Sequence, residues 1–399
     1  MSLPRIKIQY LNGQLGTVEE NSDGLLALVI GAVAVASTFA LDTPYTITSM
    51  DDLAALGITA ANNAILYQRV SEYYDEADEG TRLILYGVSP AVTMTELCDY
   101  TKTDAGYIRN LIEKENGALK GIAIANVNTS TAEESADGID PDVLTALPKA
   151  QQLAEWATTE LYAPLFVILE GRNYDATKTL KDLSTVNCNR CAVLLGDTAS
   201  GSKGASVGIL LGRIAGIPVQ RNIGRVKDGA LSPALMYIGT DKIDESSTLV
   251  ASIYDKGYIT PRKYAGRTGY YYTDDRMACE DTDDYAHLAS RRVMDKAYRI
   301  AYDTMLDVLL DELEVNEDGT LQAAVVKSWQ QTVVNAVNTQ MTADGELSAG
   351  SDGDGCVCYI DEKQNVVSTS EIAMTLKVRP MGYARYIDVK LGFQVTTTA

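Results

Sequence analysis

The groups of this 399-residue sequence whose types and spacing could support chemistry are one histidine, six cysteines, a glycine-rich turn and two acidic clusters. With a single histidine, zinc motifs that need two histidines are excluded, and any Ser–His–Asp or Cys–His machinery would have to use His287. No nucleophile stands near His287 in a pattern that would pair with it. A packed or solvated histidine is therefore the better interpretation.

The cysteines are too few for a disulfide scaffold in a chain of this length, and a reducing compartment fits them. Residues 188–191 form a CxxC and residues 356–358 a CxC, which together offer four thiolates, but a CxC is not the usual half of a zinc ribbon. A redox CxxC normally opens a helix, whereas this one leads into an apolar, strand-like run. We expect free thiols packed as small hydrophobic side chains at Cys98, Cys188, Cys191, Cys279, Cys356 and Cys358.

Residues 196–204, Gly-Asp-Thr-Ala-Ser-Gly-Ser-Lys-Gly, follow a strand-like run and open a helical pattern, which is where a phosphate-binding loop belongs. Lys203 comes one residue late and is followed by glycine instead of Ser or Thr, and Asp197 would oppose a phosphate. A glycine-rich turn between a strand and a helix is the simpler interpretation. A cytosolic α/β enzyme or nucleotide-binding protein that uses the Gly196–Gly204 turn stays open as the alternative function.

Acidic residues gather at 280–284 and at 352–354, and neither group has the spacing of a calcium loop. Acidic side chains just before a helix favour its N-terminus, so Asp283 or Asp284 is expected to cap a following helix. We expect no catalytic residue, no metal site and no cofactor in this chain.

The elements that position these groups form an alternating pattern between residues 24 and 224. This alternation predicts a mostly parallel sheet with helices on both faces. Strands are expected at 25–30, 83–86, 121–125, 165–169 and 192–195, and helices at 62–76, 105–116, 142–161 and 203–215. Residues 126–140 are polar and acidic, and we expect an exposed loop there.

The uncharged run from Leu25 to Leu41 is at the lower limit for a membrane-spanning helix, and acidic residues precede it where a signal peptide would carry positive charge. Its β-branched residues favour a buried strand followed by a turn. We expect a soluble, cytoplasmic chain without membrane insertion.

The pattern changes after residue 265. A long helix is expected to carry apolar residues from Leu288 to Leu313, and Thr320 is expected to cap a second helix with one stripe at Val325, Trp329, Val333, Val337 and Met341. Two strands with alternating apolar residues follow, at 372–378 and 387–395. The fold class is therefore α/β, with an α/β domain that has a mostly parallel sheet, followed by a C-terminal α+β domain with two long helices and terminal strands.

The formal charge of −20 opposes binding to nucleic acid, because no local basic patch reverses it. The first eleven residues nevertheless carry Arg5 and Lys7 and no acid. They read as an extended arm whose apolar side chains are Leu3, Ile6, Ile8 and Tyr10. Such an arm needs a sheet edge for its backbone groups, either on its own chain or on another subunit, and both alternatives are open from composition.

The order of several segments resembles contractile-tail sheath proteins of Mu-like phages and related prophages. The resemblance spans nearly the whole chain and is densest in its C-terminal half. The segments that carry it are Gly269-Tyr-Tyr-Tyr-Thr-Asp274, Arg291-Arg-Val-Met-Asp-Lys-Ala297, Asn316-Glu-Asp-Gly-Thr-Leu321 and the closing strand from Ile387 to Val395. None of these is a catalytic fingerprint.

The resemblance implies a structural role without enzyme activity, with an outer α/β domain and with the C-terminal core domain nearest an inner tube. Subunits of such sheaths form stacked hexameric rings around an inner tube and contract to drive that tube through a target envelope. By position, Leu3 to Tyr10 would be one intersubunit arm, and the C-terminal linker strand would carry Ile387, Val389, Leu391, Phe393 and Val395. The second long helix is the candidate tube-facing element, with Val325, Lys327, Gln330, Gln331 and Asn335.

The expected division is an arm at 1–20, an α/β domain at 21–265, a sheath core domain at 266–380 and a linker strand at 381–399. The expected partners are further copies of the chain, the inner tube protein, and baseplate and tail terminator proteins. The expected location is a virion tail or contractile particle assembled in the bacterial cytoplasm.

Overall fold

The structure is a computed structural model that describes residues 22–78, 80–128 and 137–392. The chain forms two compact units, Met1–Asp307 and Val308–Ala399. The whole of the predicted arm at 1–20, including Leu3, Ile6, Ile8 and Tyr10, lies outside the described residues, as do Phe393 and Val395.

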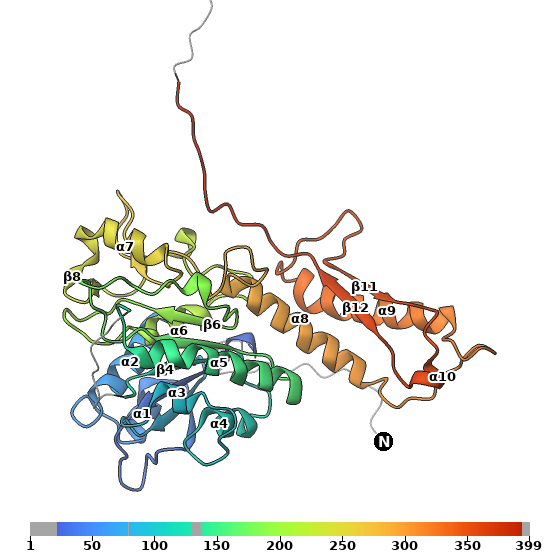
Figure 1. The fold of residues 1–399 in the computed structure, drawn as a ribbon, viewed down its shortest axis with the longest axis horizontal. Coiled ribbons are helices and arrows are strands. Elements are labelled where there is room, and N and C mark those ends of the chain that lie inside the picture. Colours follow the sequence, from blue (N-terminus) through green and yellow to red (C-terminus); the bar gives the residue numbers. More distant parts are fainter. Residues whose placement is uncertain (1–21, 79, 129–136, 393–399) are drawn as a thin grey trace, which may run out of the picture. The chain divides into compact units, whose positions relative to one another are not determined.

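The first unit is built on a six-stranded sheet in the order β2-β3-β1-β4-β5-β6. Figure 1 labels two of its strands, β4 and β6. Five strands are parallel, and β2 joins β3 in the antiparallel direction. Their bounds are β1 Leu26–Gly31, β2 Pro44–Ile47, β3 Leu83–Val88, β4 Gly121–Ala125, β5 Phe166–Glu170 and β6 Cys191–Leu194. The five parallel strands are buried along their whole length, as continuous apolar runs require when helices cover both faces. The predicted α/β sheet is confirmed.

The helices of this unit lie between the strands. Helix α2 packs against α6, and α3 packs against α5. Crossovers of the usual right hand would put α2 on one face of the sheet and α3, α4 and α5 on the other. The helices are α1 Met50–Ala55, α2 Ala64–Glu76, α3 Met94–Leu97, α4 Ile108–Lys114, α5 Pro141–Glu160, α6 Val207–Ala215, α7 Ser247–Tyr254 and α8 Leu288–Leu306. Short 3-10 turns occur at 22–24, 183–185, 226–228 and 243–245.

The two edges of the six-stranded sheet are both protected. On one side, the four-residue β2 begins with Pro44, which has no backbone N–H to donate. On the other side, Ile259 bonds to β6 through Val193 and Leu195. Short two-stranded pairs, β7 Tyr237–Ile238 with β8 Asp241–Lys242 and β9 Pro261–Arg262 with β10 Tyr271–Tyr272, complete this unit.

Helix α8 begins later and ends earlier than its sequence pattern predicts. Its N-cap is His287, so the expected caps Asp283 and Asp284 are wrong. The helix ends at Leu306, and Leu309 and Leu310 beyond it are exposed. Its polar side chains bind the rest of the unit: Arg292 donates to the carbonyls of Ile214 and Ile217, at the C-terminal end of α6.

The second unit holds α9 Ala323–Val337, a π-helical turn at Asn338–Thr342, β11 Cys356–Ile360, α10 Val366–Thr369 and β12 Met374–Val378. Strands β11 and β12 form an antiparallel two-stranded sheet, and α9 packs against β11. Alternate residues of β11 are buried, namely Cys356, Cys358 and Ile360, while Val357 and Tyr359 are exposed. The N-cap of α9 is Gln322, not the predicted Thr320.

Candidate functional site

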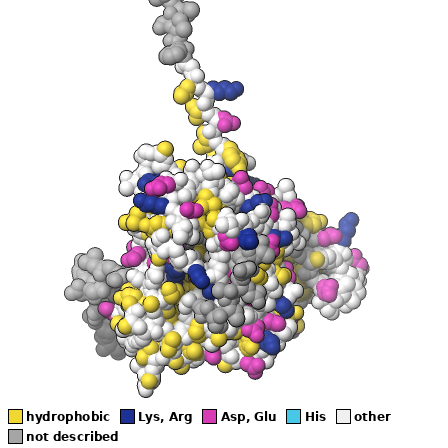
Figure 2. Space-filling model, turned by 60° about the vertical axis from the view of Figure 1, so that its left-hand side comes forward, with side chains coloured by type: hydrophobic (Ala, Val, Ile, Leu, Met, Phe, Trp, Pro, Cys, Tyr) yellow, Lys and Arg dark blue, Asp and Glu magenta, His cyan; other side chains and the backbone are white. Residues whose placement is uncertain are grey.

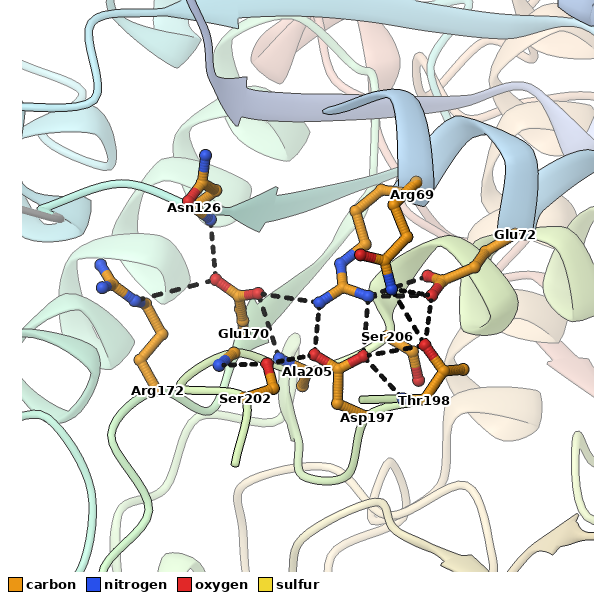
Figure 3. A network of polar contacts seen from close by, with 12 residues as sticks. Arg69, Glu72, Asn126, Glu170, Arg172, Asp197, Thr198, Ser202, Ala205 and Ser206 are labelled. Atoms are coloured by element: carbon orange, nitrogen blue, oxygen red, sulfur yellow. Dashed lines mark hydrogen bonds and ion pairs between the residues drawn. The ribbon is translucent and has the colours of Figure 1, made fainter. Parts of the chain in front are cut away.

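The glycine-rich turn at 196–204 lies between β6 and α6, as its sequence predicts, and a buried ionic network fills it (Figure 3). Asp197 accepts hydrogen bonds from Arg69 Nη1 at 2.9 Å and Nη2 at 2.6 Å, and from Ser202 Oγ at 2.5 Å. Burial alone would raise the pKa of Asp197, but the hydrogen bonds and the charge of Arg69 lower it below its usual value. The carboxylate is therefore an internal counterion of Arg69.

Arg69 is the centre of this network and comes from α2. Its Nη1 also donates to both carboxylate oxygens of Glu72 at 3.0 Å, and Thr198 Oγ1 donates to Glu72 Oε1 at 3.0 Å. Burial would lower the pKa of Arg69, but the surrounding carboxylates raise it above its ordinary value. Arg69 is thus held as a cation inside the domain, and it joins α2 to the turn that precedes α6 (Figure 3).

Glu170, the last residue of β5, occupies the place where an anionic ligand would meet this turn. Its Oε1 accepts from the backbone N–H of Ala205 at 3.1 Å, and its Oε2 accepts from that of Asn126 at 2.7 Å. A Cβ at Gly204 would lie 2.4 Å from Glu170 Oε1, so glycine is needed for this close approach. Lys203 is exposed.

The strand order reverses at β1 and β4, and open α/β sheets bind ligands in the crevice at that point. Here the chain closes it. Asn126 Nδ2 donates to the carbonyl of Gly31 at 2.9 Å, and a Cβ at Gly31 would lie 2.0 Å from the carbonyl oxygen of Asn126. Asp197 binds the Arg69 guanidinium, and Glu170 binds the backbone N–H groups of Asn126 and Ala205, so no observation favours the alternative of a nucleotide-binding protein.

A second polar cluster holds His287. Its Nδ1 lies 3.0 Å from Asp275 Oδ1 and 3.7 Å from Asp274 Oδ1. These side chains are of types that bind divalent cations. However, the amide nitrogen of Asn222 lies between the two carboxylates, 2.5 Å from Asp274 Oδ1 and 2.6 Å from Asp275 Oδ1. The side chains of Asn222, Asp274, Asp275 and His287 therefore bind one another, and we call this group the polar clamp.

The clamp explains where α8 begins. Asp275 Oδ2 accepts from the backbone N–H of Ala289 at 2.8 Å, in the first turn of the helix. Burial raises the pKa of Asp275, while the hydrogen bond from His287 opposes this rise. A carboxylate twelve residues before His287 therefore caps the helix in place of a local side chain.

All six cysteines are buried and free, as expected from the sequence. Among the described residues, no cysteine belongs to a group that could hold a metal ion. Burial raises the pKa of Cys188 to about 11 and that of Cys279 to about 12. These thiols are therefore protonated at neutral pH and pack as apolar groups.

In the second unit, the described part of the predicted linker strand has its apolar side chains in solvent. Ile387 is 75% exposed, Val389 72% and Leu391 94%. Residues 387–392 lie in no strand within the described chain. Hydrophobic side chains lie along this segment together with charged ones (Figure 2). A role in linking subunits stays a prediction.

The predicted tube-facing helix exists as α9, and its residues divide between two environments. Lys327, Gln331 and Asn335 are exposed, and Gln331 Nε2 donates to Asn335 Oδ1 at 2.8 Å. Val325 and Gln330 are half-buried. The predicted stripe is partly wrong, because Val326 and Val334 are buried in addition to Val333, Val337 and Met341, while Trp329 is half-buried.

The sequence analysis did not predict the roles of Arg69 and Glu170 or the polar clamp. Arg69 had a usable signal, because it lies on the apolar stripe of α2 with Leu66, Val70 and Tyr73 at helical spacing. A charged residue on such a stripe needs a buried partner. Glu170 offers a similar signal, as an acid that ends an apolar strand.

Comparison with solved structures defines the class of fold. A chain of the anti-feeding prophage (AFP) baseplate matches with a TM-score of 0.64 at 14% identity, covering 99% of this chain and 100% of that one. A chain of the sheath complex of the extracellular contractile injection system PVC, in its contracted state, matches with a TM-score of 0.60 at 14% identity, over 99% and 98%. The contracted AFP baseplate gives 0.63 at 13%, over 98% of each chain. This chain has the fold of sheath and baseplate proteins of contractile injection systems.

The sequence matches the descriptions "DUF2586, N-terminal domain" over residues 3–276 and "DUF2586, C-terminal domain" over residues 284–398. The chain therefore belongs to the DUF2586 family. A search of curated proteins gives no match. The boundary between the two family domains falls between residues 276 and 284. The boundary between the two compact units falls between residues 307 and 308. The domain boundary predicted from the sequence, at 265/266, stays a prediction. Within the described ranges, no helix is long and apolar enough to cross a membrane.

Proposed function

We propose that this chain is a structural subunit of a contractile tail sheath, which polymerises as stacked hexameric rings around an inner tube and contracts to drive the tube through a target cell envelope. The observation that carries the proposal is the exposed C-terminal segment, with apolar side chains at alternate positions, in the same unit as the two-stranded β11–β12 sheet. An extended segment with one apolar face has partners for its backbone N–H and C=O groups, and buries that face, only when it joins a sheet.

The segment is suited to pairing with another copy. Ile387, Val389 and Leu391 share one face of an extended chain, and Asp388 and Lys390 share the other. On joining a sheet edge of a neighbouring subunit, the first face would be buried and the second would stay in water. The N-terminal arm, with Leu3, Ile6, Ile8 and Tyr10, would pair in the same way.

The exposed face of α9 is proposed to contact the inner tube. Lys327, Gln331 and Asn335 repeat every four residues, so they form one polar stripe along the helix. Small uncharged polar side chains flank this stripe at Ser328 and Thr332, both exposed. A surface of this composition can detach at low cost, because water solvates its polar groups well and their burial would have to be compensated by new hydrogen bonds.

The remaining partners follow from this role. They are baseplate and tail terminator proteins at the two ends of the sheath, in a virion tail or contractile particle assembled in the bacterial cytoplasm. Structures with this fold belong to a baseplate and to a contracted sheath complex, which supports the proposal. The role needs no enzyme activity and no cofactor, and the closed crevice of the α/β domain is consistent with that.

Contraction requires the subunits to stay connected while the rings approach one another. Strands exchanged at their termini can keep their backbone hydrogen bonds while the compact units rotate, since the residues between strand and unit absorb the change of direction. The free energy would come from new contacts made by the outer surfaces of neighbouring subunits.

Electron microscopy of the purified full-length chain tests this proposal. Tubes or rings are expected, and deleting residues 1–15 or residues 386–399 should abolish them while circular dichroism and thermal melting stay close to those of the parent. The Lys203→Ala variant is the matched control and should assemble normally, because this exposed side chain belongs only to the glycine-rich turn. A chain that stays monomeric at high concentration, and that nucleotides stabilise unless Lys203 is replaced, would refute the proposal.

A further inference from the structure

Four donors from four separate segments converge on the carboxylate of Glu170. Oε1 lies 3.1 Å from the backbone nitrogen of Ala205 and 3.9 Å from Arg69 Nη2. Oε2 lies 2.7 Å from the backbone nitrogen of Asn126 and 3.9 Å from Arg172 Nε. Each oxygen therefore has one backbone N–H and one guanidinium, and the side chain is buried among them (Figure 3).

This is the way in which proteins bind free oxyanions. Carboxylate and phosphate are usually bound by arginine side chains and by backbone N–H groups. These N–H groups lie at the carboxyl ends of strands or just before a helix. Here Asn126 follows β4, and Ala205 lies in the turn that enters α6. The groups are arranged as in a ligand site, but the anion is supplied by the chain itself.

The site also has more donors than Glu170 uses. Arg172 Nη1 and Arg69 Nε are buried and have no hydrogen-bond partner among the described residues. Arg172 is buried over more than nine-tenths of its surface. Its separation of 3.9 Å from Glu170 is an ion pair and is too long for a hydrogen bond. A freely placed anion could approach both guanidinium groups more closely than a side chain tethered to β5.

We propose that the carboxyl edge of this sheet is an oxyanion-binding site whose resident ligand is the Glu170 side chain, and that the site accepts a small free carboxylate when this side chain is shortened. The Glu170→Ala substitution removes the γ-carbon and the carboxyl group. Acetate consists of the same heavy atoms, a carbon attached to a carboxylate, so it matches the space and the charge that are lost. The inference is independent of whether the chain assembles into a sheath.

The first test is thermal unfolding of full-length Glu170→Ala at pH 7 in sodium acetate or in sodium chloride of equal ionic strength. Acetate should raise the melting temperature in a saturable way by at least about 3 °C, because a ligand that binds only the folded state stabilises it. Formate should give a smaller rise, since it leaves the space of one carbon empty. Phosphate tests whether the site admits a larger anion.

Three variants separate this effect from general salt effects. Glu170→Gln fills the same space and should show no acetate effect, and neither should Glu113→Ala, which removes an exposed carboxylate on α4 that pairs with Arg109. Adding Arg172→Met to Glu170→Ala should weaken the response at least tenfold in acetate concentration. Equal responses in Glu170→Ala and Glu113→Ala, or no saturable response in Glu170→Ala, would overturn the proposal.

The proposal can also be tested if Glu170→Ala does not fold in the absence of a suitable anion. In that case refolding from urea in acetate should restore soluble protein with the circular dichroism of the parent, while refolding in chloride should not. Failure to recover in any of the anions, with Glu170→Gln recovering in chloride, would also overturn the proposal.

Discussion

Leu391 gives the sharpest test of the proposal that the C-terminal segment joins subunits. Its side chain is 94% exposed in the single chain, and in an exchanged strand it would lie on the buried face with Ile387 and Val389. Complete burial of a leucine contributes about 1.5–3 kcal/mol. Leu391→Asn should therefore weaken each intersubunit contact by roughly 10- to 150-fold, since about 1.4 kcal/mol corresponds to a factor of ten.

Lys390→Asn is the matched control. It introduces the same residue at the neighbouring position, so both variants carry a residue of equally low strand propensity. Lys390 is exposed and falls on the opposite face of an extended strand, so its replacement should leave assembly nearly unchanged.

The assay is the critical concentration for assembly, measured by sedimentation of purified protein and checked by electron microscopy. Leu391→Asn should raise it by one to two orders of magnitude, whereas Lys390→Asn should leave it within a factor of about two. Equal effects of the two variants would refute the assignment of the buried face. A normal critical concentration for Leu391→Asn would refute the burial of this side chain.

Three further predictions concern the α/β domain, each measured by chemical or thermal unfolding of the unassembled chain. Arg69→Met should lower the free energy of unfolding by about 3–5 kcal/mol, because it leaves buried carboxylates without their cation; a loss below 1 kcal/mol would contradict the network. Gly208→Ala should cost about 1–3 kcal/mol, because its Cβ would lie 2.0 Å from the carbonyl oxygen of Arg69, whereas Gly216→Ala, with its nearest such contact at 3.4 Å, should be nearly neutral. Burial raises the pKa of Glu76 and Glu170 above the ordinary value of 4.5, so the folded chain holds these protons more tightly than the unfolded chain and the free energy of unfolding should fall as pH rises above 4.5. The groups with lowered pKa, such as Asp197, reduce stability only below about 3.8, and a free energy of unfolding that rises as pH increases above 4.5 would contradict this sign.

The sequence predicted the central sheet closely because its strands are continuous apolar runs separated by amphipathic helices. The predicted strand at 121–125 coincides with β4, and the other four parallel strands differ by one or two residues at their ends. Such runs are informative because burial on both faces leaves few choices of side chain. The very short strands β7 to β10 carry no comparable pattern.

The polar interactions were not predictable in the same way, because they join residues that are far apart in sequence. Arg69 and Asp197 are separated by 128 positions, and no local pattern connects them. The start of α8 was misplaced for the same reason. Asp283 and Asp284 are plausible local caps, but the carboxylate that binds the first turn of the helix belongs to Asp275, which the fold brings back to it.

The six-stranded sheet and the β11–β12 sheet differ in how their edges are treated, and this difference restricts how further strands could join them. In the six-stranded sheet, a short strand that starts with proline lies at one edge and Ile259 covers the other. Among the described residues of the second unit, β11 and β12 have only each other as neighbours. Each of these two strands therefore has one side without a strand partner, so the β11–β12 sheet could accept at most two foreign strands. Subunits joined in this way would form an ordered network of defined connectivity, while the six-stranded sheet is protected from the uncontrolled edge-to-edge association that leads to aggregates.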